Sequence, residues 1–118
     1  MTSASTSPQP EQLPPQGKIY LDHVGWMVPD LALAAKAFDG LGLPLTPLSV
    51  HGVTDPATGT RTPTGTANRL AMLKQGYLEI LAPHGGIDNP TVAHLNASIA
   101  RHIGVHLLAF SVADAEGA

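Results

Sequence analysis

The chain has 118 residues, of which 43% are hydrophobic, enough for one small domain with a core and too few for two ordinary domains. Six basic and nine acidic residues give a net charge of −3 without any Lys/Arg cluster, so nucleic acid and anionic membranes are not expected as partners. The absence of cysteine excludes a disulfide framework, a thiolate nucleophile and a Cys-ligated zinc.

The first 17 residues, MTSASTSPQPEQLPPQG, have few large apolar groups and are predicted to be disordered. They lack the basic start and apolar middle of a secretion signal, and they carry no arginine for a mitochondrial presequence. The sequence contains no run of about 18 apolar residues that could span a bilayer. We therefore expect a cytoplasmic protein.

The first strand is predicted at residues 18–28, KIYLDHVGWMV, which are rich in β-branched and aromatic side chains. Alternation along a strand separates these side chains into two faces. One face carries His23, Gly25 and Met27, and the other, interpreted as core, carries Val24, Trp26 and Val28. The stretch PDLALAAKAFDGLG then predicts a helix with Asp30 as its N-cap.

Three more strands are predicted after this helix. Residues 43–50, LPLTPLSV, form a strand that its prolines favour at a sheet edge. Residues 51–65 have no periodicity and many Gly, Thr and Pro residues, which predicts a mobile flap. Residues 66–74 and 76–83 are apolar strands that should pair as a hairpin. The order is βαβββ, in an α+β fold.

Two side chains on these strands need partners. His23 is the one histidine in an apolar run, and Glu79 is a carboxylate in mid-strand, where burial without a partner is costly. In the simpler interpretation, His23 is hydrogen-bonded in place and Glu79 meets solvent or pairs with Arg69 or Lys74. Alternatively, the two residues converge. They are 56 residues apart, too far for a local ligand motif, so only the fold could bring them together.

Three further side chains are candidates for substrate binding, each with a simpler alternative. Asn68 either hydrogen-bonds a substrate carbonyl or caps a strand end. Tyr77, on the same strand face as Glu79, either orients a substrate oxygen or packs in the core. His51, at the start of the flap, either closes over a ligand or remains a solvated loop histidine. The sequence contains no nucleophile elbow, Walker loop or dinucleotide-type glycine pattern.

The segments DHVGWMVPDLALAAKAF, LGLPLTP, GTANRLAML and GYLEILAP, in this order, resemble the glyoxalase-like branch of the vicinal oxygen chelate superfamily. The resemblance covers residues 18–83 and implies a βαβββ module, two of which normally pair into a cup around a divalent metal. A histidine on the first strand and a glutamate on the last strand are usual ligand positions in that superfamily, and His23 and Glu79 stand at them. The resemblance therefore implies a site for Mn²⁺, Fe²⁺, Ni²⁺ or Zn²⁺, at which Glu79 ligates the metal or transfers a proton.

The downstream sequence predicts a linker helix followed by the start of a second module. The stretch NPTVAHLNASIARHIG indicates a helix capped by Asn89, with Pro90 in its first turn. Residues 104–118 then indicate a strand and the start of a helix, in which residues 112–114, VAD, echo residues 28–30, VPD.

In this alignment Leu107, and not a histidine, matches His23. His106 is one position off and would point to the opposite face unless a bulge intervenes. The expected organisation is a tail at 1–17, a module with its linker helix at 18–103, and an incomplete second module at 104–118. The open strand edge of such a chain favours a homo-oligomer.

The resemblance implies a glyoxalase-like protein that acts as a divalent-metal-dependent enzyme on a small-molecule substrate with vicinal oxygens. Isomerase, lyase and dioxygenase chemistry all remain open. One alternative is a metal-free protein that binds or sequesters a small molecule in the same cup, and another is an incomplete non-catalytic fragment.

Overall fold

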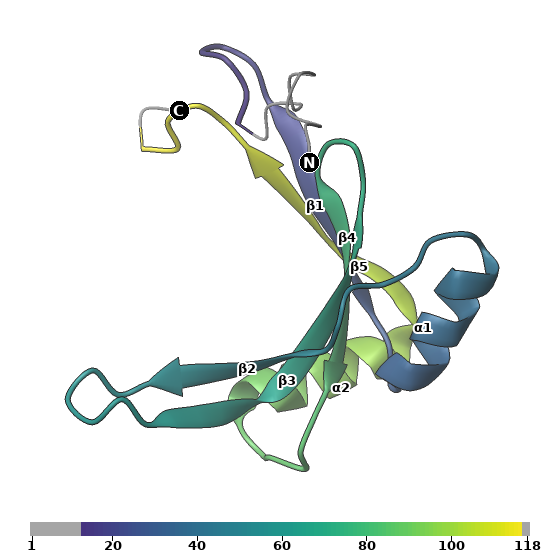
Figure 1. The fold of residues 1–118 in the computed structure, drawn as a ribbon, viewed down its shortest axis with the longest axis vertical. Coiled ribbons are helices and arrows are strands. Elements are labelled where there is room, and N and C mark those ends of the chain that lie inside the picture. Colours follow the sequence, from purple (N-terminus) through teal and green to yellow (C-terminus); the bar gives the residue numbers. More distant parts are fainter. Residues whose placement is uncertain (1–12, 117–118) are drawn as a thin grey trace, which may run out of the picture.

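The computed structural model describes residues 13–116, which form a five-stranded sheet and two helices (Figure 1). The elements in chain order are β1 (Tyr20–Met27), α1 (Leu31–Gly40), β2 (Ser49–Thr54), β3 (Arg61–Met72), β4 (Tyr77–Pro83), α2 (Pro90–Arg101) and β5 (Gly104–Ser111). The α+β class and the βαβββ order of the first five elements are confirmed. No helix among these residues is long and apolar enough to cross a membrane.

Most of the predicted N-terminal tail, residues 1–12, lies outside the described residues. Residues 13–17 form an irregular turn before β1, in which the Lys18 backbone N–H donates to the Pro15 carbonyl (3.1 Å).

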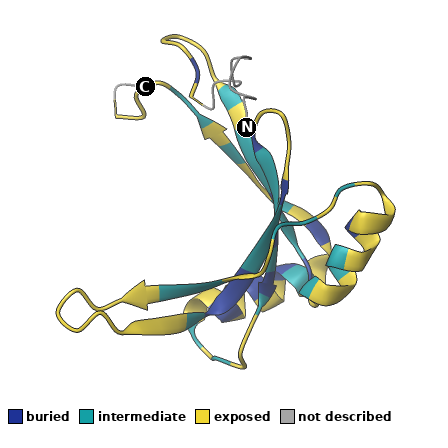
Figure 2. Ribbon diagram, viewed as in Figure 1, coloured by how far each residue is buried: buried dark blue, intermediate teal, exposed yellow. Residues whose placement is uncertain are grey.

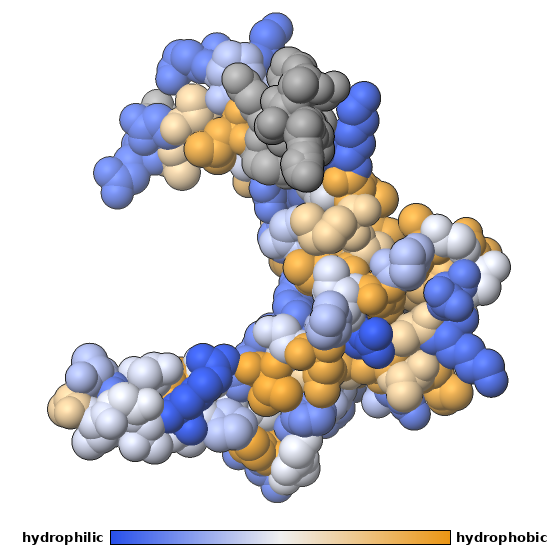
Figure 3. All heavy atoms as spheres, viewed as in Figure 1, coloured by the Kyte–Doolittle hydropathy of each residue, from blue (hydrophilic) through white to orange (hydrophobic). Residues whose placement is uncertain are grey.

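The sheet has the strand order β2-β3-β4-β1-β5, in which β1 and β4 are parallel and the other neighbours are antiparallel. It curves strongly, and both helices lie on its outer, convex face (Figure 1). The inner face borders a hollow between the β2–β3 end and the free ends of β1 and β5 (Figure 3). We call the two sides the helix face and the open face.

Buried residues gather on the helix face of the sheet (Figure 2), where one hydrophobic cluster lies between α1 and strands β1 and β4. Ile80 and Val28 are buried there against Phe38 of α1, and the indole of Trp26 meets the Phe38 ring edge-on, with centroids 5.4 Å apart. The core positions predicted for Trp26 and Val28 are thus confirmed. Val24, predicted with them, is only half-buried and lies outside this cluster.

Both helices begin at the caps that the sequence predicts. The Asp30 carboxylate accepts hydrogen bonds from the backbone N–H groups of Ala32 and Leu33, which satisfies two donors at the start of α1. The Asn89 side chain accepts from the Val92 N–H at the start of α2, and its amide donates to the Thr64 carbonyl of β3. Asn89 therefore also ties α2 to the sheet.

The second strand and the flap were predicted wrongly. The second strand, β2, runs from residue 49 to 54 and not from 43 to 50. Residues 51–65 belong mainly to a hairpin of β2 and β3, whose turn is closed by hydrogen bonds between Asp55 and the backbone of Gly59 and Thr60. The pairing of two weak segments stabilises this hairpin, and a pattern search within one segment cannot detect such pairing. The hairpin predicted from residues 66–74 and 76–83 is confirmed as β3–β4.

The register of β1 against β5 is symmetric about the pair of Val24 with Leu108. Positions 28–30 align with 112–114 at an offset of 84 residues. When each residue of a β1–β5 pair is replaced by the residue 84 positions away, the Val24–Leu108 pair is unchanged and each of the remaining pairs becomes another pair of the same register. The exchanged pairs are Tyr20–Ser111 with Met27–Gly104, Leu21–Phe110 with Trp26–Val105, and His23–Ala109 with Gly25–Leu107. A repeated strand would pair with its copy in this way, and the repeat itself stays a prediction.

Candidate functional site

The predicted site residues lie on the open face, opposite the core. Along β4, Ile80 turns toward the helices, so Tyr77 and Glu79 turn toward the hollow. The parallel register of β1 and β4 places His23 beside Tyr77. On β3, Asn68 pairs with Leu81 and therefore shares this face. The fold thus brings His23 and Glu79 together, with Asn68 and Tyr77 as their neighbours.

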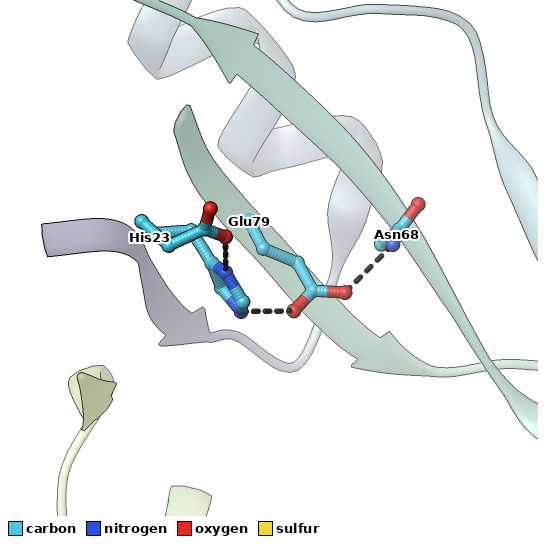
Figure 4. A network of polar contacts seen from close by, with 4 residues as sticks. His23, Asn68 and Glu79 are labelled. Atoms are coloured by element: carbon cyan, nitrogen blue, oxygen red, sulfur yellow. Dashed lines mark hydrogen bonds and ion pairs between the residues drawn. The ribbon is translucent and has the colours of Figure 1, made fainter. Parts of the chain in front are cut away.

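A chain of polar contacts joins three strands at this point (Figure 4). The Asp22 carboxylate lies 2.8 Å from His23 Nδ1, and His23 Nε2 faces Glu79 Oε1 at 4.0 Å. The other oxygen of Glu79, Oε2, accepts a hydrogen bond from the Asn68 amide nitrogen at 2.7 Å. His23 and Glu79 are thus each held by a neighbour on one side and directed toward each other on the other side.

The gap between His23 and Glu79 is slightly wider than the spacing of two ligands on one metal ion. At 4.0 Å, Nε2 and Oε1 are too far apart for a hydrogen bond. Two ligands of a tetrahedral ion with bonds of about 2.1 Å lie roughly 3.4 Å apart, so a small side-chain shift would let both bind one ion. Each side chain keeps 19% of its surface exposed, which leaves room for further ligands.

His23 and Glu79 would offer two ligands to a metal ion. Among residues 13–116, no three His, Cys, Asp or Glu side chains are grouped so that they could hold a metal ion. The chemistry of the donor pair, one imidazole nitrogen and one carboxylate oxygen, suits Mn²⁺, Fe²⁺, Ni²⁺ or Zn²⁺, with the remaining positions left to water or a bound molecule.

Tyr77 lies flat against His23, with ring centroids 4.7 Å apart and planes inclined by only 4°. Burial raises the pKa of the Tyr77 phenol above its ordinary value of 10.0, and the negative charges of Asp22 and Glu79 raise this pKa further. The hydroxyl group therefore keeps its proton at neutral pH and can donate a hydrogen bond.

Arg69 and Lys74, the ion-pair partners considered for Glu79, make other contacts or face solvent. Arg69 donates from Nε to the Thr46 carbonyl (2.8 Å), and Lys74 is exposed in the turn between β3 and β4. Neither forms an ion pair with Glu79 in the part of the chain that the structure describes. Asn68 is its partner instead.

His51 does not lie on a flap, because it belongs to β2. Its Nδ1 lies 2.7 Å from the hydroxyl of Thr66, which is buried on β3 two residues before Asn68. His51 and Thr66 therefore continue the polar residues of the open face toward the β2–β3 hairpin, and neither the lid nor the solvated loop predicted for His51 is present.

The bulge considered for His106 exists, but it does not bring this residue to the site. The step from Gly25 to Trp26 on β1 spans two residues on β5, so His106 is the extra residue. Its ring stacks on His102 beyond α2, with centroids 3.9 Å apart. Leu107 borders the site instead, because a Cβ built at Gly25 would lie 2.9 Å from the Leu107 Cβ.

Asp22 and Thr66 are the residues that sequence reasoning missed. An aspartate directly before His23 was visible, but consecutive residues of a regular strand point to opposite faces, so its contact with the imidazole could not be expected. Thr66 had no signal of its own in the sequence.

Comparison with known proteins identifies the family of the chain. A family model described as a glyoxalase-like domain matches residues 21–118, a range that includes all of the five strands except Tyr20. This match confirms the resemblance inferred from the sequence. No curated protein matches the chain.

Proposed function

The chain belongs to the glyoxalase-like domain family, and from that premise we propose that its open face binds a divalent metal ion through His23 and Glu79 and acts on a small molecule with two adjacent oxygen atoms. The observation that carries this proposal is the 4.0 Å approach of Nε2 and Oε1, with Asp22 and Asn68 holding the two side chains from behind.

Each polar residue has a role in this proposal. A divalent ion held there would act as a Lewis acid on the oxygens of the bound molecule. Glu79 would either ligate this ion through Oε1 or, when Oε1 is not bound to the ion, take up or return a proton there, because Asn68 holds only Oε2. Figure 4 shows the Asn68 carbonyl oxygen directed away from Glu79, where it can accept a hydrogen bond from a substrate. Isomerase, lyase and dioxygenase reactions are all compatible with these roles.

A second candidate function is metal-free binding of a small molecule on the same face. Two observations favour it: the described residues supply only two ligands, and apolar side chains surround them. Leu70 pairs with Glu79, Leu81 pairs with Asn68, and Leu107 lies beside Gly25. Such a surface would bind the apolar part of a molecule whose polar groups meet His23 and Glu79.

Calorimetric titration of the metal-stripped protein with Mn²⁺, Fe²⁺, Ni²⁺ and Zn²⁺ separates the two candidates. We expect His23→Ala and Glu79→Ala each to weaken binding, and the double variant to lose less than the sum of the two losses, because both report on one site. The matched control is His94→Ala, which removes an exposed imidazole from α2 and should leave the affinity unchanged.

Failure to bind any of the four ions, or unchanged binding by His23→Ala, would contradict the metal site. Metal-free binding would then be the better description of the open face.

A further inference from the structure

Asp22 occupies an irregular position that turns its side chain toward His23. From Leu21 to His23 the β1 chain advances two residues, while its partner β5 advances only one, from Phe110 to Ala109. Asp22 is therefore the extra residue of a β-bulge, a feature that redirects side chains. In a regular strand its carboxylate would point to the face opposite the imidazole, whereas here Oδ2 lies 2.8 Å from His23 Nδ1.

We infer that Asp22 is a positioning residue, which holds the His23 ring as the tautomer protonated at Nδ1 and presents Nε2 to Glu79 as a free lone pair. An ionised carboxylate only accepts hydrogen bonds, so the proton of the short contact must be on Nδ1. A neutral imidazole carries one such proton, and Nε2 is then an acceptor. The inference rests on the proposed function only for its consequence in metal binding.

The 4.0 Å gap agrees with this tautomer. Nε2 and the Glu79 carboxylate oxygen are both acceptors, so neither can donate a hydrogen bond to the other. If Nε2 carried the proton, a direct hydrogen bond of about 2.9 Å to Glu79 would be available. The two acceptors instead face each other across a space that a cation, or a donor group of a bound molecule, can fill.

Two further contacts fix the ring and the bulge. The Tyr77 ring stacks on the imidazole at 4.7 Å and restricts its rotation. Gly76, the residue before Tyr77, is buried against the bulge. A Cβ at Gly76 would overlap the Asp22 carbonyl oxygen. The turn before β4 thus packs directly on the backbone that carries Asp22.

The inference is tested first in the metal-free protein, where it does not depend on the proposed function. Nitrogen-15 NMR of the imidazole rings near pH 8, where unperturbed histidines are neutral, reports which ring nitrogen carries the proton. We expect the Nδ1-protonated tautomer for His23 in the wild type. In Asp22→Ala we expect a shift toward the Nε2-protonated form, and in Asp22→Asn, which keeps an acceptor oxygen, a largely retained wild-type signal. Asp88→Ala removes an exposed carboxylate from the loop before α2 and serves as the control.

Titration of the same variants with Zn²⁺ measures the consequence. Asp22→Ala should bind about 10- to 100-fold more weakly than the wild type, and Asp22→Asn should recover part of the loss. An Nε2-protonated His23 in the wild type, or a tautomer unchanged by Asp22→Ala, would overturn the inference, and the wild-type spectrum decides this even if the variant does not fold. Absence of metal binding together with the expected tautomers would contradict the proposed function alone.

Discussion

The two faces of strand β4 differ in what surrounds them and in what they do. Toward the helices, Ile80 has no exposed surface and packs on Val28 and Phe38. One residue away, Glu79 keeps 19% of its side chain exposed on a face that no helix covers (Figure 2). The polar groups there contact one another and are partly exposed to solvent, so their burial is not costly, while the apolar contacts that stabilise the fold lie on the other face. Substitutions on the two faces should therefore affect different properties.

The largest effect is expected on the helix face. Ile80→Ala should lower the free energy of unfolding by about 3 kcal/mol, because it removes buried methyl and methylene groups and leaves a cavity. Urea denaturation of the variant and the wild type measures this loss. Leu33→Ala removes a side chain of similar size from the exposed side of α1, where Leu33 is 68% exposed, and should change stability by less than about 1 kcal/mol. Equal losses in the two variants would show that the core is not where the structure places it.

A smaller effect is expected at the turn between β3 and β4, which contains Gly76. Gly76 has a φ of 75°, which disfavours other residues, and any Cβ there would overlap the Asp22 carbonyl oxygen. Gly76→Ala should therefore destabilise the protein by roughly 2 kcal/mol and also displace the bulge beside His23. Gly86→Ala is the matched control, because Gly86 has a φ of 66° but nothing within 4 Å of its added Cβ, so only the conformational cost of roughly 1 kcal/mol applies. If the two variants unfold alike in urea, the contact of the turn with Asp22 contributes nothing.

The two faces also differ in how far the sequence predicts them. Alternation along a strand is a local property, and it is enough to assign Trp26 to the core and to separate His23 from it. The contact of Asp22 with His23 depends on a bulge that arises only when β1 pairs with β5, far away in the chain. The position of His51 likewise depends on the pairing of β2 with β3, which replaces the predicted flap. Local patterns thus predict which face a residue occupies, whereas tertiary pairing decides which neighbour it meets.

The smallest effect is expected from the hydroxyl of Tyr77, and it should appear only at high pH. Its pKa is raised in the folded protein by burial and by the charges of Asp22 and Glu79, so above the ordinary value of 10.0 the folded state holds a proton that the unfolded state has lost. The stabilising contribution of this proton is complete below that value and is lost as the pH rises through the folded pKa. Tyr77→Phe retains the ring that stacks on His23 but has no group to titrate. Between about pH 8 and pH 11, the urea midpoint of the wild type should therefore fall further than that of Tyr77→Phe, since the lysines that titrate in this range are common to both proteins. If the urea midpoints of the two proteins fell in parallel with rising pH, neither burial nor the charges of Asp22 and Glu79 would raise the Tyr77 pKa. The open face would then be more hydrated than its contacts indicate.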